Sequence, residues 1–568
     1  MSRMRRSTLM TAIISTCYFG NVDAATYRSE TYTLVSDLLN TMVAVRFPDV
    51  AMRAPIEGVE TDGTQVALLD AKEIGKPKKP GCFQISEIAV NDSEILNPSL
   101  VRSLTNELIG ECATKEILGK ALNSLNGYLV DSGYVTSRVY IGPQDLADGT
   151  IEFTGVDGRI ERIQYQDNDW SARTRVASAF PVGEGDILRL IDLERGIDQI
   201  SAPRSQQVTM NLIPGTKPGY SIIDLSDRPK EQLAKSLRFR AGIDNFVTKA
   251  EGSEKSTIGI DGDNLLNLND SWSLTHIGSF DTNALAVSGS VPMGYWTHGI
   301  SYSYSDYLSP IDANTQLFGR SETKTVNTKF RFFKTKTATL DFTASLDKKF
   351  SDRVINDVEL ADQKMTVGRL GASFSHLSDF SLSGSATWSH GLKWFDASED
   401  IDLSGASPRA QFDKVQFNAN LYKPLSQYVT LSSSLAGQYA RDPLYSSEQI
   451  SIGGQYSVRG FSTSPASGDS GAYIRNDLLF RLSENLGPKW LAKYLPSVQP
   501  YVGIDYGWVD DNALESQNGL GGIGYGVRVN YGKLSADVGA GIPLYKQTGT
   551  FTKKPDKYTR ITYDLYTY

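Results

Sequence analysis

The sequence predicts two small α+β modules followed by a 16-stranded antiparallel transmembrane β-barrel. Three observations carry this prediction. The chain opens with a secretory leader, residues up to about 230 mix helical and strand periodicity, and residues from 232 onward alternate apolar and polar side chains in short runs. Such alternation in the second half of an exported chain is typical of an outer-membrane barrel.

The composition of the 568-residue chain excludes several classes of protein. Hydrophobic residues make up 40 %, the mean hydropathy is −0.28, and no stretch approaches the roughly 20 apolar residues of a spanning helix, which excludes a polytopic helical membrane protein. The 28 tyrosines, 22 phenylalanines and 7 tryptophans allow extensive burial, which excludes a disordered chain. A net charge of −8 argues against a nucleic-acid partner.

The N-terminus has the three parts of a secretory signal. Arg3, Arg5 and Arg6 precede the apolar run 8–19, and small side chains flank Asp23 at the cleavage positions. We therefore expect a signal peptide over residues 1–24. Its removal leaves Cys82 and Cys112, either as one disulfide in an oxidising compartment or as two buried free thiols. Two thiols cannot complete a structural zinc site, so no metal or other cofactor is expected.

Residues 25–230 divide into four predicted parts. An amphipathic helix is expected within residues 25–50, and a Pro-, Gly- and Lys-containing linker within 51–80. Residues 81–157 have the order strand, helix, strand, strand, with the helix at 114–129. Residues 158–230 predict a second copy of that module, and its helices are expected at 169–180 and 187–200.

Residues 231–568 are predicted to form the barrel. In one run, Leu340, Phe342, Ala344 and Leu346 alternate with polar residues, and similar runs recur between turns rich in Asp, Asn, Ser and Gly. About 21 residues per strand and connection suit 16 strands. A soluble sandwich or propeller is the alternative, but the polar face is rich in Ser, Thr, Asn and Arg, as a watery lumen requires.

Two catalytic or cofactor motifs occur in unsuitable contexts. The run Gly519–Gly524 matches G-x-G-x-x-G by spacing, but no strand–helix unit surrounds it, so the dinucleotide interpretation fails. The run Gly468–Gly471 is similar to a trypsin-like nucleophile segment without a suitable histidine. We therefore expect no enzymatic activity.

One motif in the barrel region is specific. The segment 451–461 ends in Val458-Arg459-Gly460-Phe461 and continues through Gly468-Asp469 to Asp477. It closely resembles the signature of the TpsB transporters of two-partner secretion, the haemolysin-activator and filamentous-haemagglutinin exporter family. The resemblance covers most of the chain and implies two periplasmic POTRA domains before the barrel.

The same resemblance assigns further residues. The motif of the family's first POTRA domain is matched by Gly133, Tyr134, Thr136, Gln144, Asp145 and Leu146. The pair Cys82 and Cys112 matches the haemolysin-activator branch, and residues 25–50 occupy the place of a barrel-plugging helix, although they are more apolar than a lumen plug should be. The C-terminal signal departs from the family pattern, because the last residue is Tyr568 and Asp564 interrupts the apolar alternation.

The resemblance implies a loop lock. The Val458–Phe461 segment would be the tip of an extracellular loop folded into the lumen, and the strand motif Gly503, Asp505 and Gly507 would supply the carboxylate that receives Arg459. A buried guanidinium needs such a partner, and its planar fork suits a carboxylate. Without the resemblance, Arg459 would be interpreted as one more lumen arginine facing water.

The function implied is export of a large, unfolded partner exoprotein through an outer-membrane barrel without ATP. The expected partners are an exoprotein with an N-terminal secretion domain, outer-membrane lipid, and the barrel-assembly machinery during biogenesis. An assembly factor that inserts other barrels is the main alternative, although that class usually carries three or more POTRA domains. A diffusion porin has no need of the preceding modules, and a barrel phospholipase needs a catalytic triad.

Overall fold

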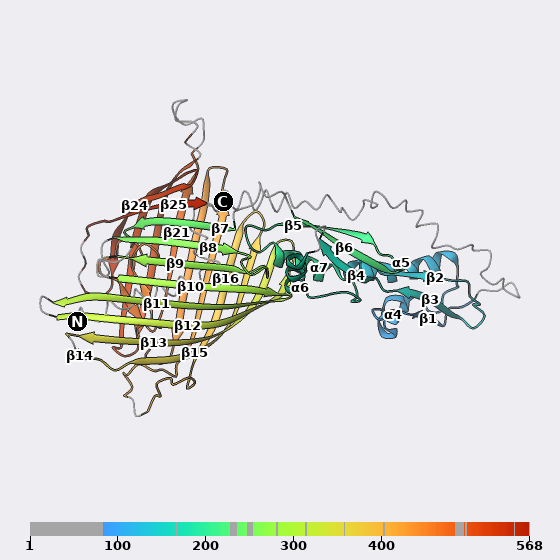
Figure 1. Ribbon diagram of the computed structural model, residues 1–568, viewed down its shortest axis with the longest axis horizontal. Coiled ribbons are helices and arrows are strands. Elements are labelled where there is room, and N and C mark those ends of the chain that lie inside the picture. Colours follow the sequence, from blue (N-terminus) through green and yellow to red (C-terminus); the bar gives the residue numbers. More distant parts are fainter. Residues whose placement is uncertain are drawn as a thin grey trace.

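The computed structural model describes residues 83–165, 169–227, 236–246, 254–279, 282–312, 315–356, 358–401, 404–482, 494, 497–549, 551 and 553–566. The predicted signal peptide, N-terminal helix and linker, together with Cys82, lie outside these residues. Two modules in a row lead into a closed barrel (Figure 1). No helix within the described ranges has the length and apolarity needed to cross a membrane.

The first module is a three-stranded sheet packed against helices. Its elements are β1 (Glu87–Asn91), α4 (Pro98–Thr105), the 3-10 helix η1 (Asn106–Leu108), α5 (Lys115–Asp131), β2 (Arg138–Ile141) and β3 (Thr150–Val156). The central strand β3 is parallel to β1 and antiparallel to β2. Thr114 caps α5 by accepting a hydrogen bond from the backbone N–H of Ile117 at 3.3 Å, which confirms the predicted helix.

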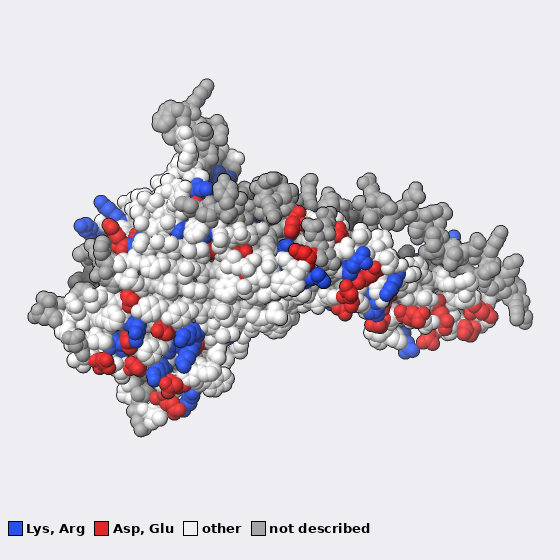
Figure 2. Space-filling model, viewed as in Figure 1, with Lys and Arg blue, Asp and Glu red and all other residues white. Residues whose placement is uncertain are grey.

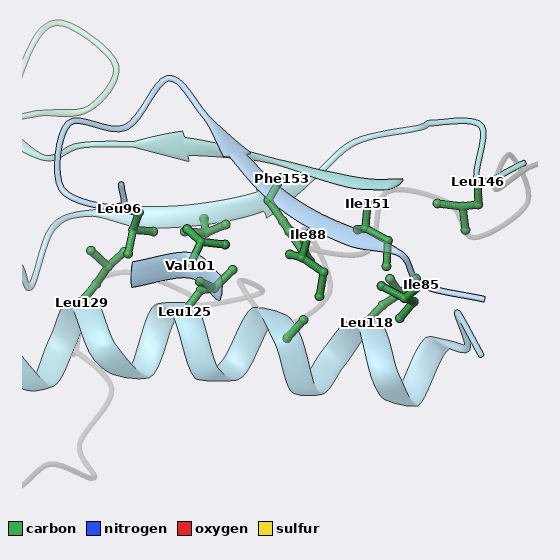
Figure 3. Packing of buried hydrophobic residues seen from close by; sticks show 12 residues of the cluster. Ile85, Ile88, Leu96, Val101, Leu118, Leu125, Leu129, Leu146, Ile151 and Phe153 are labelled. Atoms are coloured by element: carbon green, nitrogen blue, oxygen red, sulfur yellow. The ribbon is translucent and has the colours of Figure 1, made fainter. Parts of the chain in front are cut away.

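The core of this module lies between α5 and the sheet. Leu118, Leu125 and Leu129 point from one face of α5 toward Ile88 and Phe153 of the sheet (Figure 3). The helix α4 was not predicted. Its sequence signal is the pair Asn97-Pro98, in which the asparagine side chain accepts from Leu100 N at 3.0 Å and proline occupies the first turn.

The second module repeats this topology. It contains β4 (Arg159–Tyr165), α6 (Trp170–Ala179), α7 (Leu190–Ile200), β5 (Val208–Pro214) and β6 (Tyr220–Asp227). The central strand β6 is parallel to β4 and antiparallel to β5. Both predicted helices are therefore present. The shared sheet order, first–third–second in each module, supports two copies of one unit despite slight sequence similarity.

The barrel closes by antiparallel pairing of its last strand with its first. It contains 16 main strands within the described residues, and β14 (Val358–Glu359) is a short addition beside β13. The main strands are β7 (Leu237–Asp244), β8 (Lys255–Asp263), β9 (Ser271–Gly278), β10 (Thr282–Met293), β11 (Trp296–Asp312), β12 (Thr315–Lys334), β13 (Ala338–Ile355), β15 (Gln363–Leu377), β16 (Ser381–Leu392), β17 (Asp413–Pro424), β18 (Val429–Ala440), β21 (Ser470–Phe480), β22 (Val498–Asp511), β23 (Ser516–Tyr531), β24 (Leu534–Lys546) and β25 (Asp556–Tyr566).

The strands differ greatly in length. β12 and β13 have 20 and 18 residues, whereas β7 and β9 have 8 each. In Figure 1, β11 to β13 reach farther from the modules than β7 to β9 do. The end of the barrel opposite the modules is therefore uneven.

Alternation along the strands separates an apolar outer face from a polar lumen. Ile300, Val326 and Leu370 are more than half exposed on the outer face. Their neighbours Thr325 and Arg369 face inward and are buried or nearly so. The barrel side seen in Figure 2 has a broad zone with few charges, and charged residues gather toward its far end and over the modules. This pattern suits a wall surrounded by lipid.

Asp564 lies on the inward face of the last strand. In β25, Ile561 and Tyr563 are 40 % and 42 % exposed, whereas Asp564 is 7 % exposed. Because successive side chains of a strand point to opposite faces, Asp564 belongs to the inward set.

The second module is docked on the barrel turn between β10 and β11. Arg195 on α7 donates through Nε to Gly294 O at 3.1 Å and through Nη2 to Tyr295 O at 3.3 Å. Gln199, one turn later, donates to Gly294 O at 2.7 Å. Asp192 bonds the Tyr295 hydroxyl. Burial, with Arg331 nearby, lowers the pKa of Arg195 to about 10, so it stays charged at neutral pH.

Replacement of Arg195 by alanine is expected to loosen this joint. The turn would lose two charge-assisted hydrogen bonds, each contributing about 1.5–3 kcal/mol. Distances between labels placed on the second module and on the barrel should broaden in the Arg195→Ala protein. The matched control is Arg173→Ala, since that exposed side chain bonds the carbonyl of Asp169 in its own helical turn. Equal distance distributions in both variants would contradict the prediction.

Candidate functional site in the barrel lumen

The connection between β18 and β21, residues 441–469, is called the lumen loop below. It carries the short hairpin of β19 (Ile450–Ile452) and β20 (Ala466–Gly468). Its tip residues Val458, Arg459 and Phe461 are each 0 % exposed. Gly460 has a φ of +94°, a left-handed conformation that glycine adopts readily, and this turns the chain after Arg459.

Arg459 makes a two-pronged contact with Asp505 on β22. Nε donates to Oδ2 at 2.6 Å and Nη2 donates to Oδ1 at 2.7 Å. The backbone N–H of Arg459 also donates to Oδ2, at 3.1 Å. Asp505 alternates with Ile504 and Tyr506, which are 60 % and 49 % exposed, so the carboxylate faces the lumen. The structure thus brings together the two residues that the sequence motif paired.

A second carboxylate, Asp477 on β21, also contacts Arg459. Its Oδ1 lies 2.7 Å from Arg459 Nη2, and its Oδ2 lies 3.0 Å from Arg475 Nη2 and 3.6 Å from Arg528 Nη2. All of these side chains are buried or nearly so. The sequence analysis assigned no role to Asp477. Its place in the stretch that carries the family motif is the signal that could have identified it.

Glycines of the wall form a slot for the arginine. A Cβ at Gly503 would lie 2.6 Å from Arg459 Nη2, and one at Gly541 would lie 2.8 Å from Arg459 Cβ. At Gly524 a Cβ would overlap the guanidinium itself. The glycine alternation on β23 therefore allows close approach of the loop, and these contacts leave little room for another position of the side chain.

The neighbours of Arg459 add further contacts between the loop tip and the barrel wall. Gly460 N donates to the Tyr558 hydroxyl at 3.0 Å, and Ser462 N donates to Asp556 Oδ2 at 2.7 Å, both on β25. Val458 and Phe461 pack into an apolar cluster with Ile452, Ala466, Val509 and Leu520. A Cβ at Gly507 would lie 3.1 Å from Val458 Cγ2, so the last glycine of the strand motif makes room for this packing.

Comparison with known proteins identifies the family. The profile for the haemolysin secretion/activation proteins ShlB/FhaC/HecB matches residues 219–529. The chain belongs to this family. A ShlB-type POTRA profile matches residues 83–158 and another POTRA profile matches 159–214. The chain is thus a TpsB transporter of two-partner secretion, in the outer membrane with its POTRA domains in the periplasm.

Individual relatives are similar over most of their length. The outer membrane transporter CdiB of Dickeya dadantii (strain 3937) is 32 % identical over 486 residues, 82 % of this chain and 83 % of its own. The hemolysin transporter protein ShlB of Serratia marcescens is 27 % identical, covering 81 % and 82 %. The solved structure of CdiB from Escherichia coli has a TM-score of 0.73 at 26 % identity, covering 89 % of this chain and 96 % of that one.

Most of the POTRA motif residues act inside the first domain of this TpsB protein. Gln144 exchanges two hydrogen bonds of 2.8 Å with the backbone of Glu152 on β3, and Asp145 accepts from Ala147 N at 3.0 Å. Leu146 is buried in the core. Tyr134 N donates to Leu129 O at 2.8 Å and ends α5. These contacts shape the domain.

Two further motif residues join the POTRA domains. Gly133 has a φ of +87°, and its carbonyl accepts from Leu190 N of α7 at 2.9 Å. Thr136 packs against Gly158, where a Cβ would overlap it. Of the predicted cysteine pair, Cys112 is disulfide-bonded and Cys82 lies outside the described residues, so their pairing stays a prediction.

Proposed function

We propose that this TpsB transporter exports one large partner exoprotein, in unfolded form, from the periplasm to the cell surface. The lumen loop is the observation that supports this best. Barrels of 16 strands enclose an aqueous channel, and here noncovalent contacts hold a loop inside it. A seated loop blocks the path of a polypeptide and can leave it without breaking a covalent bond. The Arg459–Asp505 pair is the latch in this proposal.

The POTRA domains would bind the N-terminal secretion domain of the exoprotein. In the second domain, β5 lies at the edge of its sheet, and its Leu212 and Ile213 are 37 % and 41 % exposed. An edge strand can accept an extended chain as a further strand, since the main-chain hydrogen bonds formed depend little on sequence. Such binding suits an adhesin, a haemolysin or a related exoprotein that arrives unfolded.

The proposal also covers the driving force of transport, the domains of the chain and its membrane partners. The periplasm holds no ATP, so folding of the exoprotein outside the cell would give the transport its direction. No catalytic step is involved. The proposed division of the chain is a signal peptide (1–24), an N-terminal helix (25–50), a linker (51–80), two POTRA domains (81–157 and 158–230) and the barrel (231–568). Outer-membrane lipid surrounds the barrel, and the barrel-assembly machinery inserts it.

Co-expression with the large exoprotein encoded beside the transporter tests this function. The exoprotein should appear in the medium with the transporter and stay in the periplasm without it. The alternative function, insertion of other barrels, makes the opposite prediction. In that case deletion of the transporter would lower the amounts of other outer-membrane barrels and leave the exoprotein unaffected.

A further inference from the structure

A buried carboxylate ties the lumen loop to the wall at a second place. Glu448 precedes β19, and its side chain is 1 % exposed. Its Oε1 lies 2.5 Å from Lys349 Nζ, and its Oε2 lies 2.6 Å from Lys414 Nζ. Arg369 Nη2 lies 3.3 Å from Oε1. These cations come from β13, β15 and β17, so one loop carboxylate meets three neighbouring parts of the wall.

Wall residues hold Arg369 of this cluster in place. Arg369 Nε is 2.7 Å from Asp347 Oδ2, and its Nη1 donates to Ser389 Oγ at 2.8 Å. Asp347 also accepts from Thr325 Oγ1 at 2.9 Å. Three cations therefore face two carboxylates while Glu448 is present, and one carboxylate when it is withdrawn. The wall side chains of this cluster carry an excess of positive charge, and Glu448 of the loop supplies a compensating carboxylate.

The two attachments of the loop differ in construction. The tip at Arg459 is seated among β21 to β25, in a slot where wall glycines leave room for it. Glu448 contacts a different arc of the wall, through one side chain and one carbonyl. That carbonyl accepts from Lys414 Nζ at 2.9 Å and from Gln438 Nε2 at 2.8 Å. The loop is thus held at two separate arcs of the wall, and at Glu448 the contact depends on charge.

We propose that Lys349, Arg369 and Lys414 form a carboxylate-binding site on the lumen wall, which Glu448 fills in the resting channel and leaves during export. The Glu448 part of the loop then separates from the wall, and the exposed cations take acidic side chains of the passing polypeptide. This last step rests on the proposed export function. Release of Glu448 itself needs no exoprotein and can be measured on the transporter alone.

Planar-bilayer recordings of the purified full-length transporter test the site in potassium chloride. Glu448→Gln keeps the size of the side chain and removes its charge. The open-channel frequency should rise about tenfold, because a neutral amide holds three cations poorly. The chloride-to-potassium permeability ratio should rise at least about threefold, because Lys349 and Lys414 would lose their carboxylate partner and attract chloride. The control is Glu399→Gln, whose side chain is 51 % exposed and pairs with Lys393 at 3.5 Å; it should behave as the parent protein.

A charge exchange separates a binding site from a general packing role. Glu448→Lys should increase opening more than Glu448→Gln does, and adding Lys414→Glu should return both conductance and selectivity toward the parent values. The proposal is overturned if Glu448→Gln leaves both properties unchanged, or if the exchange restores neither. It is also overturned if the glutamine variant no longer gives a heat-modifiable barrel, since Glu448 would then be a folding element. Failure of exoprotein secretion with these electrical results intact would instead count against the proposed function.

Discussion

Arg459→Ala is expected to raise the conductance of the channel and to change secretion of the partner exoprotein. The substitution leaves Asp505 buried without its guanidinium, and breaking one side of a buried ion pair costs about 3–5 kcal/mol. Such a loss would raise the population of unseated loop by at least about a hundredfold. Secretion into the medium and single-channel recordings are the two measurements.

Arg459→Lys sharpens this test. Lysine keeps the positive charge but cannot form the two parallel bonds that Arg459 makes with Asp505. We expect it to behave like the alanine variant if the latch depends on geometry. If Arg459→Ala leaves both secretion and conductance at parent values, the latch is wrong. Heat-modifiable migration of each variant shows that the barrel has folded.

Gly524→Ala should unseat the loop without removing any charge. The added methyl group would overlap the guanidinium of Arg459, whose position is fixed by Asp505 and Asp477. Overpacking of such a site costs about 1–3 kcal/mol, enough to raise the open fraction about fivefold or more. The conductance of the purified protein should rise, and protease should reach the loop from the outer surface of intact cells.

The matched control lies on the same strand. A Cβ at Gly521 would meet Tyr545 Cβ at 3.4 Å, an ordinary contact on the outer face of β23. Gly521→Ala should therefore leave conductance and protease resistance unchanged. Similar behaviour of the two alanine variants would mean that the slot around Arg459 does not hold the loop in place.

Local patterns in the sequence predicted the barrel and both modules. Helix α5 follows from its leucine spacing and its Thr114 cap, and the strands follow from alternation, because both signals depend on neighbouring residues. The Arg459–Asp505 contact was accessible through the family motif. The inward position of Asp564 was not accessible in this way, because a single sequence does not mark which alternating set of a terminal strand faces lipid.

Other features depend on contacts between distant segments. Glu448 follows two serines in a polar loop, and its cations come from three separate strands, so no local pattern marks it. Docking of Arg195 uses main-chain carbonyls of Gly294 and Tyr295. Every turn has such carbonyls, so the sequence does not indicate which of them accept a hydrogen bond from a distant side chain. Charges that appear solvent-exposed in a sequence become buried only once the barrel closes.

The unequal strand lengths make the barrel end opposite the POTRA domains asymmetric. The 20-residue β12 and 18-residue β13 rise on one side, whereas the 8-residue β7 and β9 leave the other side low. A polypeptide that emerges from the lumen would pass the high wall of β12 and β13 on one side and the low wall of β7 and β9 on the other. The first folded turns of this polypeptide would then form on the side of the short strands, and successive segments would leave the cell surface in that direction.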